Sequence, residues 1–290
     1  MGLMKARGRK TSSAPAGRTR SWHGFLGFRP AVGVAALAML GVVAVVALAQ
    51  PPRVRIVRGF PSPGDYPEGV AWDGSGLWCN NFTDGSLHKV DSADGGVLEH
   101  YQGQNLPGSP EGLAWDGQYL WSCDWHQGII VQFRPTPTGI EVENTFPKPA
   151  NSGPSVGLEW DGTSIWLSCW PDLSQGLEFG QLFKLDPVTL AVQQRHVLPV
   201  RYIEDLAWDG RYLWSAEWLR GIGFAIEPAT GDTLHTYNTP GLYPVGNAWD
   251  GTYLWVTDTD KDSIWALDIS GITPTASVSW SHVKNLFRGR

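Results

Sequence analysis

Cysteine is scarce in this chain: only Cys79, Cys123 and Cys169 occur among 290 residues. Their spacing matches no metal-binding motif. An odd number leaves at least one thiol unpaired within the chain, and we expect all three to be buried in strands, where free cysteine is common. Long helical periodicity is also missing after the first fifty residues, which indicates an all-β domain there.

Acidic residues are absent from the basic residues 1–30, and residues 31–49 that follow are an uncharged run rich in Ala, Val and Leu. This run is longer than the usual core of a signal peptide (about 7–15 residues) and close to a membrane span (about 20). We therefore expect export. The globular part is either held at the membrane by a helix over 31–49 and faces outward, or is secreted after cleavage near Ala49. No twin-arginine motif precedes the run.

Positive charge is concentrated in that N-terminus. Without residues 1–49 the formal net charge falls from −6 to −13, because seven basic and no acidic residues are removed. Such an acidic domain argues against nucleic acid as a partner. A small-molecule or peptide ligand is the partner expected, and we expect the chain to be a monomer.

What the sequence has in abundance is a repeat. Trp-Asp-Gly occurs five times, with a second Trp six residues after the first, at a period of 41–48 residues. The five leading residues are Trp72, Trp115, Trp160, Trp208 and Trp249. Asp-Gly between apolar runs signals a hairpin, and this period is that of propeller blades. The sequence predicts an all-β, five-bladed β-propeller of four-stranded antiparallel blades, preceded by one N-terminal hydrophobic helix.

The predicted boundaries are a basic region (1–30), a signal anchor or signal peptide (31–49), a linker (50–53), and the propeller with a short C-terminal tail (54–290). Two segments compete for the outer strand of the last blade. Residues 54–60 would close the ring from the N-terminal side, and residues 273–280 would close it from the C-terminal side. The sequence leaves both open.

One face of the ring carries the candidate site, because the loop before the first strand and the loop after the second strand of each blade share a face. Four residues before the leading Trp, three blades have Glu68, Glu111 and Glu204. Carboxylates brought together there would raise a pKa, bind a cationic ligand, or hold a metal, with oxygen ligands favouring Ca²⁺ or Mg²⁺. Alternatively, each Glu ties neighbouring blades together through main-chain N–H groups.

Aromatic side chains follow the second strands. Trp125, Trp170 and Trp218 lie four residues after their second Trp and could form a stacking wall for a cationic or planar ligand, or only cap the blades. Further candidate ligand-binding residues are Asp124, Glu217 and Asn247, the last a polar residue at an apolar strand position. His126 is the one histidine in these loops and the candidate general base.

Several propeller families resemble parts of this sequence. The stretch from Pro110 to Asp116, with its Glu-Gly pair, resembles the first-strand motif of gluconolactonase-like and NHL-repeat propellers, and 254–268 resembles a YWTD blade. In the lactonase-like family this Glu is a divalent-metal ligand, and only Glu68 and Glu111 match it with Gly next. Those families usually have six blades.

Five blades and a Trp-rich mouth are instead similar to the plant and bacterial glutamine cyclotransferases. Residues 213–218 and 227–231 are similar to one blade of that family, although its Asn before the Trp is missing here.

The functional expectation has two branches. The first is an exported, membrane-anchored propeller that binds a small ligand or peptide at an acidic, Trp-lined channel mouth. The alternative is an enzyme, either a glutaminyl-peptide cyclotransferase-like aminoacyltransferase or a divalent-metal-dependent lactonase-like hydrolase. In the enzyme, Glu111, Glu204 and His126 are the candidate catalytic residues, and Glu68, Glu111 and Glu204 the candidate metal ligands.

Overall fold

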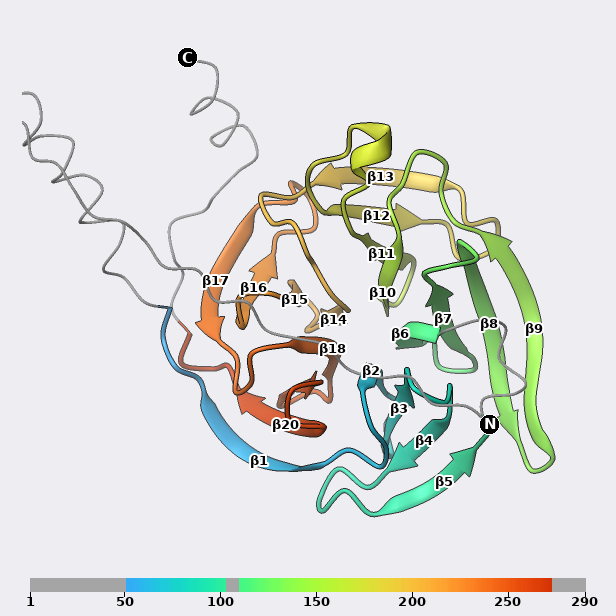
Figure 1. Cartoon of the computed structure of the whole chain (residues 1–290), viewed down its shortest axis with the longest axis vertical. Helices are drawn as coiled ribbons and strands as arrows, with labels where there is room; N and C mark the ends of the chain where they lie inside the picture. Colours follow the sequence, from blue (N-terminus) through green and yellow to red (C-terminus); the bar gives the residue numbers. More distant parts are fainter. Residues whose placement is uncertain (1–50, 103–109, 273–290) are drawn as a thin grey trace, which may run out of the picture. The chain divides into compact units, whose positions relative to one another are not determined.

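The computed structural model describes residues 51–102 and 110–272. Within these residues twenty strands form five antiparallel sheets of four strands, arranged as blades around a common axis (Figure 1). The predicted five-bladed, all-β propeller is confirmed. The predicted hydrophobic segment 31–49 lies outside the described residues, and none of the helical structure inside them is long and apolar enough to cross a membrane.

The blades follow the chain in order. Blade one consists of β2 (Pro67–Trp72), β3 (Leu77–Asn81), β4 (Leu87–Val90) and β5 (Val97–Tyr101). Blade two consists of β6 (Pro110–Trp115), β7 (Leu120–Asp124), β8 (Ile129–Thr136) and β9 (Gly139–Pro147). Blade three consists of β10 (Ser155–Trp160), β11 (Ile165–Cys169), β12 (Gln181–Leu185) and β13 (Val192–Val197). Its long loop contains the 3-10 helix η2 (Leu173–Gln175).

Blade four consists of β14 (Ala207–Trp208), β15 (Leu213–Glu217), β16 (Ile222–Ile226) and β17 (Thr233–Asn238). Blade five consists of β18 (Pro244–Trp249), β19 (Leu254–Asp258), β20 (Ser263–Asp268) and, as its outer strand, β1 (Arg55–Pro61). β1 pairs with β20 in antiparallel register, so the N-terminal candidate closes the ring. The competing segment 273–280 lies outside the described residues.

The Trp-Asp-Gly motif builds the same device in every blade. One carboxylate oxygen of the Asp accepts a hydrogen bond from Nε1 of the second Trp at 2.7–2.8 Å in all five copies. The Gly of each turn has φ between +91° and +99°, a conformation that favours glycine. We call this end of the ring, with its five Asp-Gly turns, the turn face.

The second Trp of each blade packs against the apolar residues of the next blade. Trp121, for example, lies in one cluster with Ile165 and Phe183 of blade three, and Trp255 of blade five contacts the blade-one core at Val70. These second tryptophans are Trp78, Trp121, Trp166, Trp214 and Trp255, all at most 4% exposed. Burying an indole in each interface, with its N–H satisfied by the Asp, stabilises the ring.

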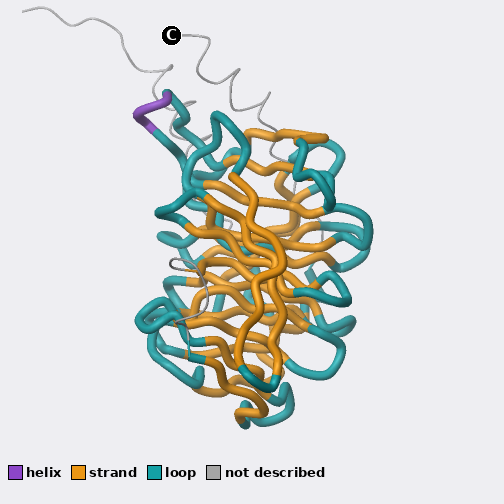
Figure 2. The backbone as a smooth tube through the Cα atoms, turned by 90° about the vertical axis from the view of Figure 1, so that its right-hand side faces the viewer, coloured by secondary structure: helices purple, strands orange, loops and turns teal. Residues whose placement is uncertain are grey.

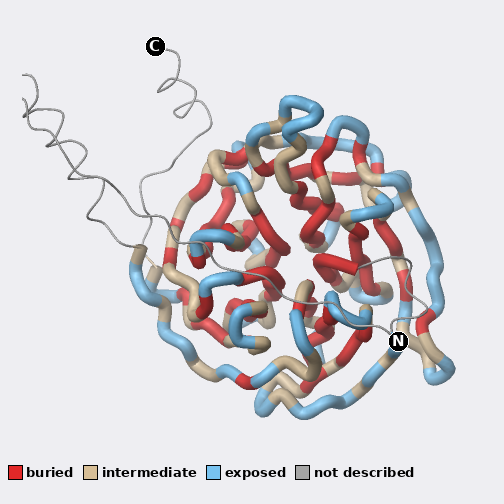
Figure 3. The backbone as a smooth tube through the Cα atoms, viewed as in Figure 1, coloured by how far each residue is buried: buried red, intermediate tan, exposed pale blue. Residues whose placement is uncertain are grey.

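Burial falls from the axis outward. Inner strands such as β7 and β11 are fully buried, whereas the outer strands β5, β9 and β13 are largely exposed (Figure 3). The loops lie in two layers on either side of the strands (Figure 2). Cys79, Cys123 and Cys169 are free and buried, as the sequence predicts.

Candidate functional site

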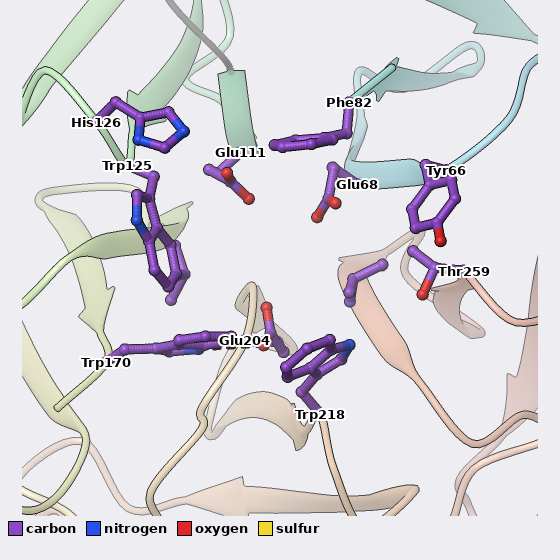
Figure 4. Close-up of a pocket in the computed structure, with 12 residues that line it drawn as sticks. Tyr66, Glu68, Phe82, Glu111, Trp125, His126, Trp170, Glu204, Trp218 and Thr259 are labelled. Carbon is purple, nitrogen blue, oxygen red and sulfur yellow. Dashed lines mark hydrogen bonds between the residues drawn. The ribbon is translucent and has the colours of Figure 1, made fainter. Parts of the chain in front are cut away.

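A pocket of about 270 Å³ lies at the end of the axis opposite the turn face, and we call its lining residues the mouth. Two repeat positions supply ten of them, one from each blade at each position. Four residues before the leading Trp are Glu68, Glu111, Val156, Glu204 and Val245; four residues after the second Trp are Phe82, Trp125, Trp170, Trp218 and Thr259. Tyr66 and His126 complete the mouth (Figure 4).

The strands that carry Glu68 and Glu111 are irregular where these residues enter the mouth. The pairing of β2 with β3 shifts register between Pro67 and Val70, and that of β6 with β7 shifts between Pro110 and Leu113. Such bulges bend the strand and redirect a side chain. Figure 4 shows the carboxyl groups of Glu68, Glu111 and Glu204 turned toward the middle of the pocket.

Beneath the glutamates lies Asp205, which sequence reasoning did not single out. Its carboxylate accepts a hydrogen bond from the N–H of Leu158 at 2.9 Å and longer contacts of 3.4 Å from those of Leu113 and Val70. Its own N–H donates to the Val245 carbonyl at 3.1 Å. One residue of blade four thus touches all the other blades at the axis.

The repeat itself marks this residue. At its position the other blades have Gly69, Gly112, Gly157 and Gly246. A Cβ added to Gly112 would lie 2.5 Å from an Asp205 carboxylate oxygen, so the centre of the ring has room for few side chains. The signal that could have found Asp205 is therefore one Asp in a column of glycines.

Glu68 and Glu111 form a hydrogen-bonded carboxyl pair. Burial and the neighbouring charge of Glu111 raise the pKa of Glu68 well above its usual value. Burial and the charge of Asp124 raise the pKa of Glu111 to about 7, against the opposing effect of the hydrogen bond from Glu68. Both carboxyl groups are thus harder to ionise than an exposed glutamate, because burial and the neighbouring acids disfavour their charged forms.

Glu204 is the third acid and is only 4% exposed. Its carboxyl accepts a hydrogen bond from Nε1 of Trp170 at 3.1 Å. Burial, together with the charges of Glu68 and Glu111, raises the pKa of Glu204 well above its usual value. The structure thus brings the three equivalent acids to one pocket, where Glu68 and Glu111 both raise the pKa of Glu204.

The three outer tryptophans form a continuous wall. The rings of Trp125 and Trp170 meet edge to face with centroids 4.5 Å apart, and those of Trp170 and Trp218 are 5.2 Å apart. Trp170 also contacts Tyr202. The pocket thus has an aromatic side from blades two to four and a carboxyl pair from blades one and two, an arrangement suited to a ligand with an amino group and a flat polar group.

Of the four other residues that the sequence analysis named as site candidates, one lines the mouth and three do not. His126 lines the mouth but is exposed at its rim. Asp124, Glu217 and Asn247 are not among the lining residues. The Glu217 carboxylate pairs with Arg220 at 3.3 Å, and the Asn247 amide donates to the Asp205 carbonyl at 3.1 Å. Asn247 therefore lies outside the lining of the pocket, and within the described residues its buried Oδ1 has no hydrogen-bond partner.

Glu68, Glu111 and Glu204 all line the mouth, and Glu204 accepts the hydrogen bond from Trp170. Within the described residues no group of three or more His, Cys, Asp or Glu side chains is placed to hold a metal ion.

Comparison with solved structures gives fold neighbours. The glutaminyl cyclase of Myxococcus xanthus is 18% identical, with a TM-score of 0.61 over 76% of this chain and 99% of that one. The aldose sugar dehydrogenase of Streptomyces coelicolor, in its PQQ-bound form, is 15% identical, with a TM-score of 0.50 over 80% and 88%. A gluconolactonase from Xanthomonas campestris is 18% identical, with a TM-score of 0.49 over 77% and 86%.

No family model and no curated protein matches the sequence. At these identities the likeness is one of fold: the chain is a propeller related in architecture to the glutaminyl cyclase.

Proposed function

We propose that the mouth binds the free amino end of a glutamine derivative or a glutamine-leading peptide and catalyses its cyclisation by intramolecular aminoacyl transfer. The observation that carries this proposal is that the buried carboxyl groups of Glu68 and Glu111 line one pocket with a tryptophan wall, where the pKa of Glu111 is raised to about 7. A general acid or base works best when its pKa lies close to the operating pH.

The chemistry needs what this pair has. The substrate's α-amino nitrogen attacks the carbon of its own side-chain amide and loses a proton, and the amide nitrogen gains a proton and leaves as ammonia. Glu111, as the carboxylate, takes the proton from the attacking nitrogen. Glu68, as the acid, gives one to the leaving nitrogen. The pair then exchanges a proton through its hydrogen bond and returns to its starting state.

The walls suit such a substrate. The pocket volume of about 270 Å³ lies just below the usual range for small-molecule sites, about 300–1,000 Å³, so it matches a single amino-acid side chain. Trp125, Trp170 and Trp218 would hold the flat amide and face the ammonium group. The open mouth would let the rest of a peptide extend into solvent. The glutaminyl cyclase of similar fold agrees with this proposal.

The test is to incubate the purified protein with a glutaminyl dipeptide and measure ammonia release, with loss of ammonia from the peptide followed by mass spectrometry. The N-acetylated dipeptide is the matched control, because it lacks the attacking amine. Glu111→Gln is the matched protein control. Absence of turnover by the wild-type protein would refute the enzyme.

A ligand-binding propeller without catalysis is the second candidate, favoured by the contiguous tryptophan wall. Quenching of tryptophan fluorescence by the dipeptide, without ammonia release, would support it over the enzyme. Metal analysis of the purified protein tests the lactonase alternative, because stoichiometric Ca²⁺ or Mg²⁺ would show that the acids ionise and bind an ion instead of sharing a proton.

We also propose that residues 1–49 direct export, with the propeller outside the cytoplasmic membrane and monomeric, and with no nucleic-acid partner. The support is the acid-free basic head followed by the uncharged run at 31–49. Cell fractionation and N-terminal sequencing of the mature protein test this. Full-length protein in the cytoplasmic fraction would contradict export, and a mature N-terminus near Gln50 would contradict the anchor alone.

A further inference from the structure

The main chain at each mouth glutamate is held by a polar side chain from the blade before it. The Thr257 hydroxyl donates to the carbonyl of Glu68 at 2.7 Å. The Asn80 amide donates to the carbonyl of Glu111 at 2.9 Å, and the Ser168 hydroxyl donates to that of Glu204 at 2.8 Å. All three donors are fully buried.

These donors share one position in the repeat, two residues after the second Trp. In the two remaining blades that position is Cys123 and Ala216. The blades that follow these two carry Val156 and Val245 at the mouth. A strong side-chain donor therefore stands before each of the three glutamates and before neither valine, a pattern that covers all five blade interfaces.

The mouth positions of blades one, two, three and five all stand at shifts of strand register, so a bulge by itself does not account for the donors. The glutamates differ from the valines in their carboxyl groups. The three carboxyl groups are crowded, and any ionised pair among them repels. Thr257 also accepts a hydrogen bond from the N–H of Gly246 at 2.6 Å, which ties its hydroxyl between two blades.

We propose that Thr257, Asn80 and Ser168 are positioning residues, each of which fixes the main chain at the mouth glutamate of the next blade and so aims its carboxyl into the pocket. Their effect on the reaction rests on the proposed cyclisation. Their effect on the carboxyl positions does not.

The sharpest test is a pair of variants at one site. Thr257→Val keeps the shape and removes the hydroxyl, whereas Thr257→Ser keeps the hydroxyl. With a glutaminyl dipeptide as substrate, we expect Thr257→Val to lower kcat about fivefold or more, with KM changed less than about twofold, from the loss of one hydrogen bond. Thr257→Ser should keep kcat close to the wild-type value. If Thr257 only stabilised the fold, kcat would not fall in Thr257→Val while KM stays nearly constant.

The matched controls add a hydroxyl donor at the same repeat position in the two blades that precede Val156 and Val245. Cys123→Ser and Ala216→Ser should leave kcat unchanged, whatever they do to the melting temperature. Ser168→Ala repeats the test at Glu204 if Thr257→Val fails to fold. Equal kcat for wild type, Thr257→Val and Ser168→Ala would overturn the proposal.

Crystal structures of the two Thr257 variants give a readout that needs no reaction. We expect the Glu68 carboxyl to lose its hydrogen bond to Glu111 in Thr257→Val and to keep it in Thr257→Ser. If the wild-type protein releases no ammonia, the proposed cyclisation fails and this arm alone decides the positioning role. An intact pair in Thr257→Val would overturn that role.

Discussion

The turn face and the mouth lie at opposite ends of the same inner strands, and Asp161 at one end contrasts with Glu68 and Glu204 at the other. At the turn face, burial alone would raise the pKa of Asp161, but hydrogen bonds from Lys184, Thr163 and Trp166 lower it to about 2. At the mouth, burial and neighbouring carboxyls raise the pKa of Glu68 and Glu204.

The difference lies in what each carboxyl group faces. Each turn Asp faces N–H donors supplied by its own hairpin, and Asp161 also pairs with the Lys184 ammonium at 2.9 Å. Each mouth Glu faces other acids. The turn face repeats one arrangement in every blade because every blade interface needs it, whereas the mouth differs from blade to blade. The comparison teaches that this repeat separates the residues that hold the ring from those available for chemistry.

The largest effect is expected from deleting residues 1–61, which removes β1 and leaves β20 as an exposed edge of blade five. The turn face and the mouth both require a closed ring, so the deletion should abolish the cooperative unfolding transition and the pocket together. Circular dichroism and thermal denaturation measure this. A deletion of residues 1–50 keeps β1 and is the control. A stable ring without β1 would mean that another segment closes blade five.

At the mouth, Glu111→Gln should lower turnover of a glutaminyl dipeptide by at least about 100-fold, because it removes a general base of suitable pKa while keeping volume. The pH–rate profile of the wild-type protein should show an apparent pKa near 7 that belongs to the Glu68–Glu111 pair. A variant with wild-type kcat and an unchanged profile would contradict the acid–base role.

The same variant should change stability in a pH-dependent way. The unfolded chain releases the Glu111 proton near 4.5 and the folded protein near 7, so the folded state holds more protons in between. The contribution of Glu111 to stability is thus present below pH 4.5 and lost as pH rises through 7. At pH 8, Glu111→Gln should exceed wild type in free energy of unfolding by about 1–3 kcal/mol. Denaturant titrations at pH 4 and pH 8 measure the difference.

At the turn face the expected sign is reversed. Asp161→Asn should cost about 1–2 kcal/mol of stability at pH 7, because it weakens hydrogen bonds to a charged acceptor and removes the Lys184 pair. The contribution of Asp161 is present above pH 3.8 and is lost as pH falls toward 2. Asp209→Asn is the control, since the same clasp to Trp214 exists there. An equal loss in both variants would show that Lys184 adds nothing. Turnover per folded molecule should stay at the wild-type value.

The smallest effect is expected from Glu217→Gln. This residue was a candidate for ligand binding, but its carboxylate is paired with Arg220 and lies outside the mouth. Kd for the dipeptide, measured by tryptophan quenching, should change by less than about twofold, because the Glu217 carboxylate does not line the pocket. A larger change would extend the site beyond the mouth.

The repeat made much of this predictable. Trp115-Asp116-Gly117 and its four copies fix the hairpin, the period and hence the number of blades, because each step depends only on residues close in sequence. Glu68, Glu111 and Glu204 share one position in the repeat, which places them at the same height along the ring axis. The aligned repeats also contain Asp205 as the exception at a glycine position, and Thr257, Asn80 and Ser168 as polar residues at one shared position. Their roles could not be predicted from the alignment, because they depend on contacts between different blades.

What the sequence determined by itself was the local unit: the Asp-Gly turn, the strand alternation and the level at which each residue sits along the axis. The tertiary structure decided which segment closes the ring, that Glu217 and Asn247 lie outside the pocket, and that burial beside Glu111 raises the pKa of Glu68. The reason is physical. Hairpin geometry follows from neighbouring residues, whereas closure, burial and pKa values depend on groups brought together from different blades, and their interaction depends on distance and on exclusion of water.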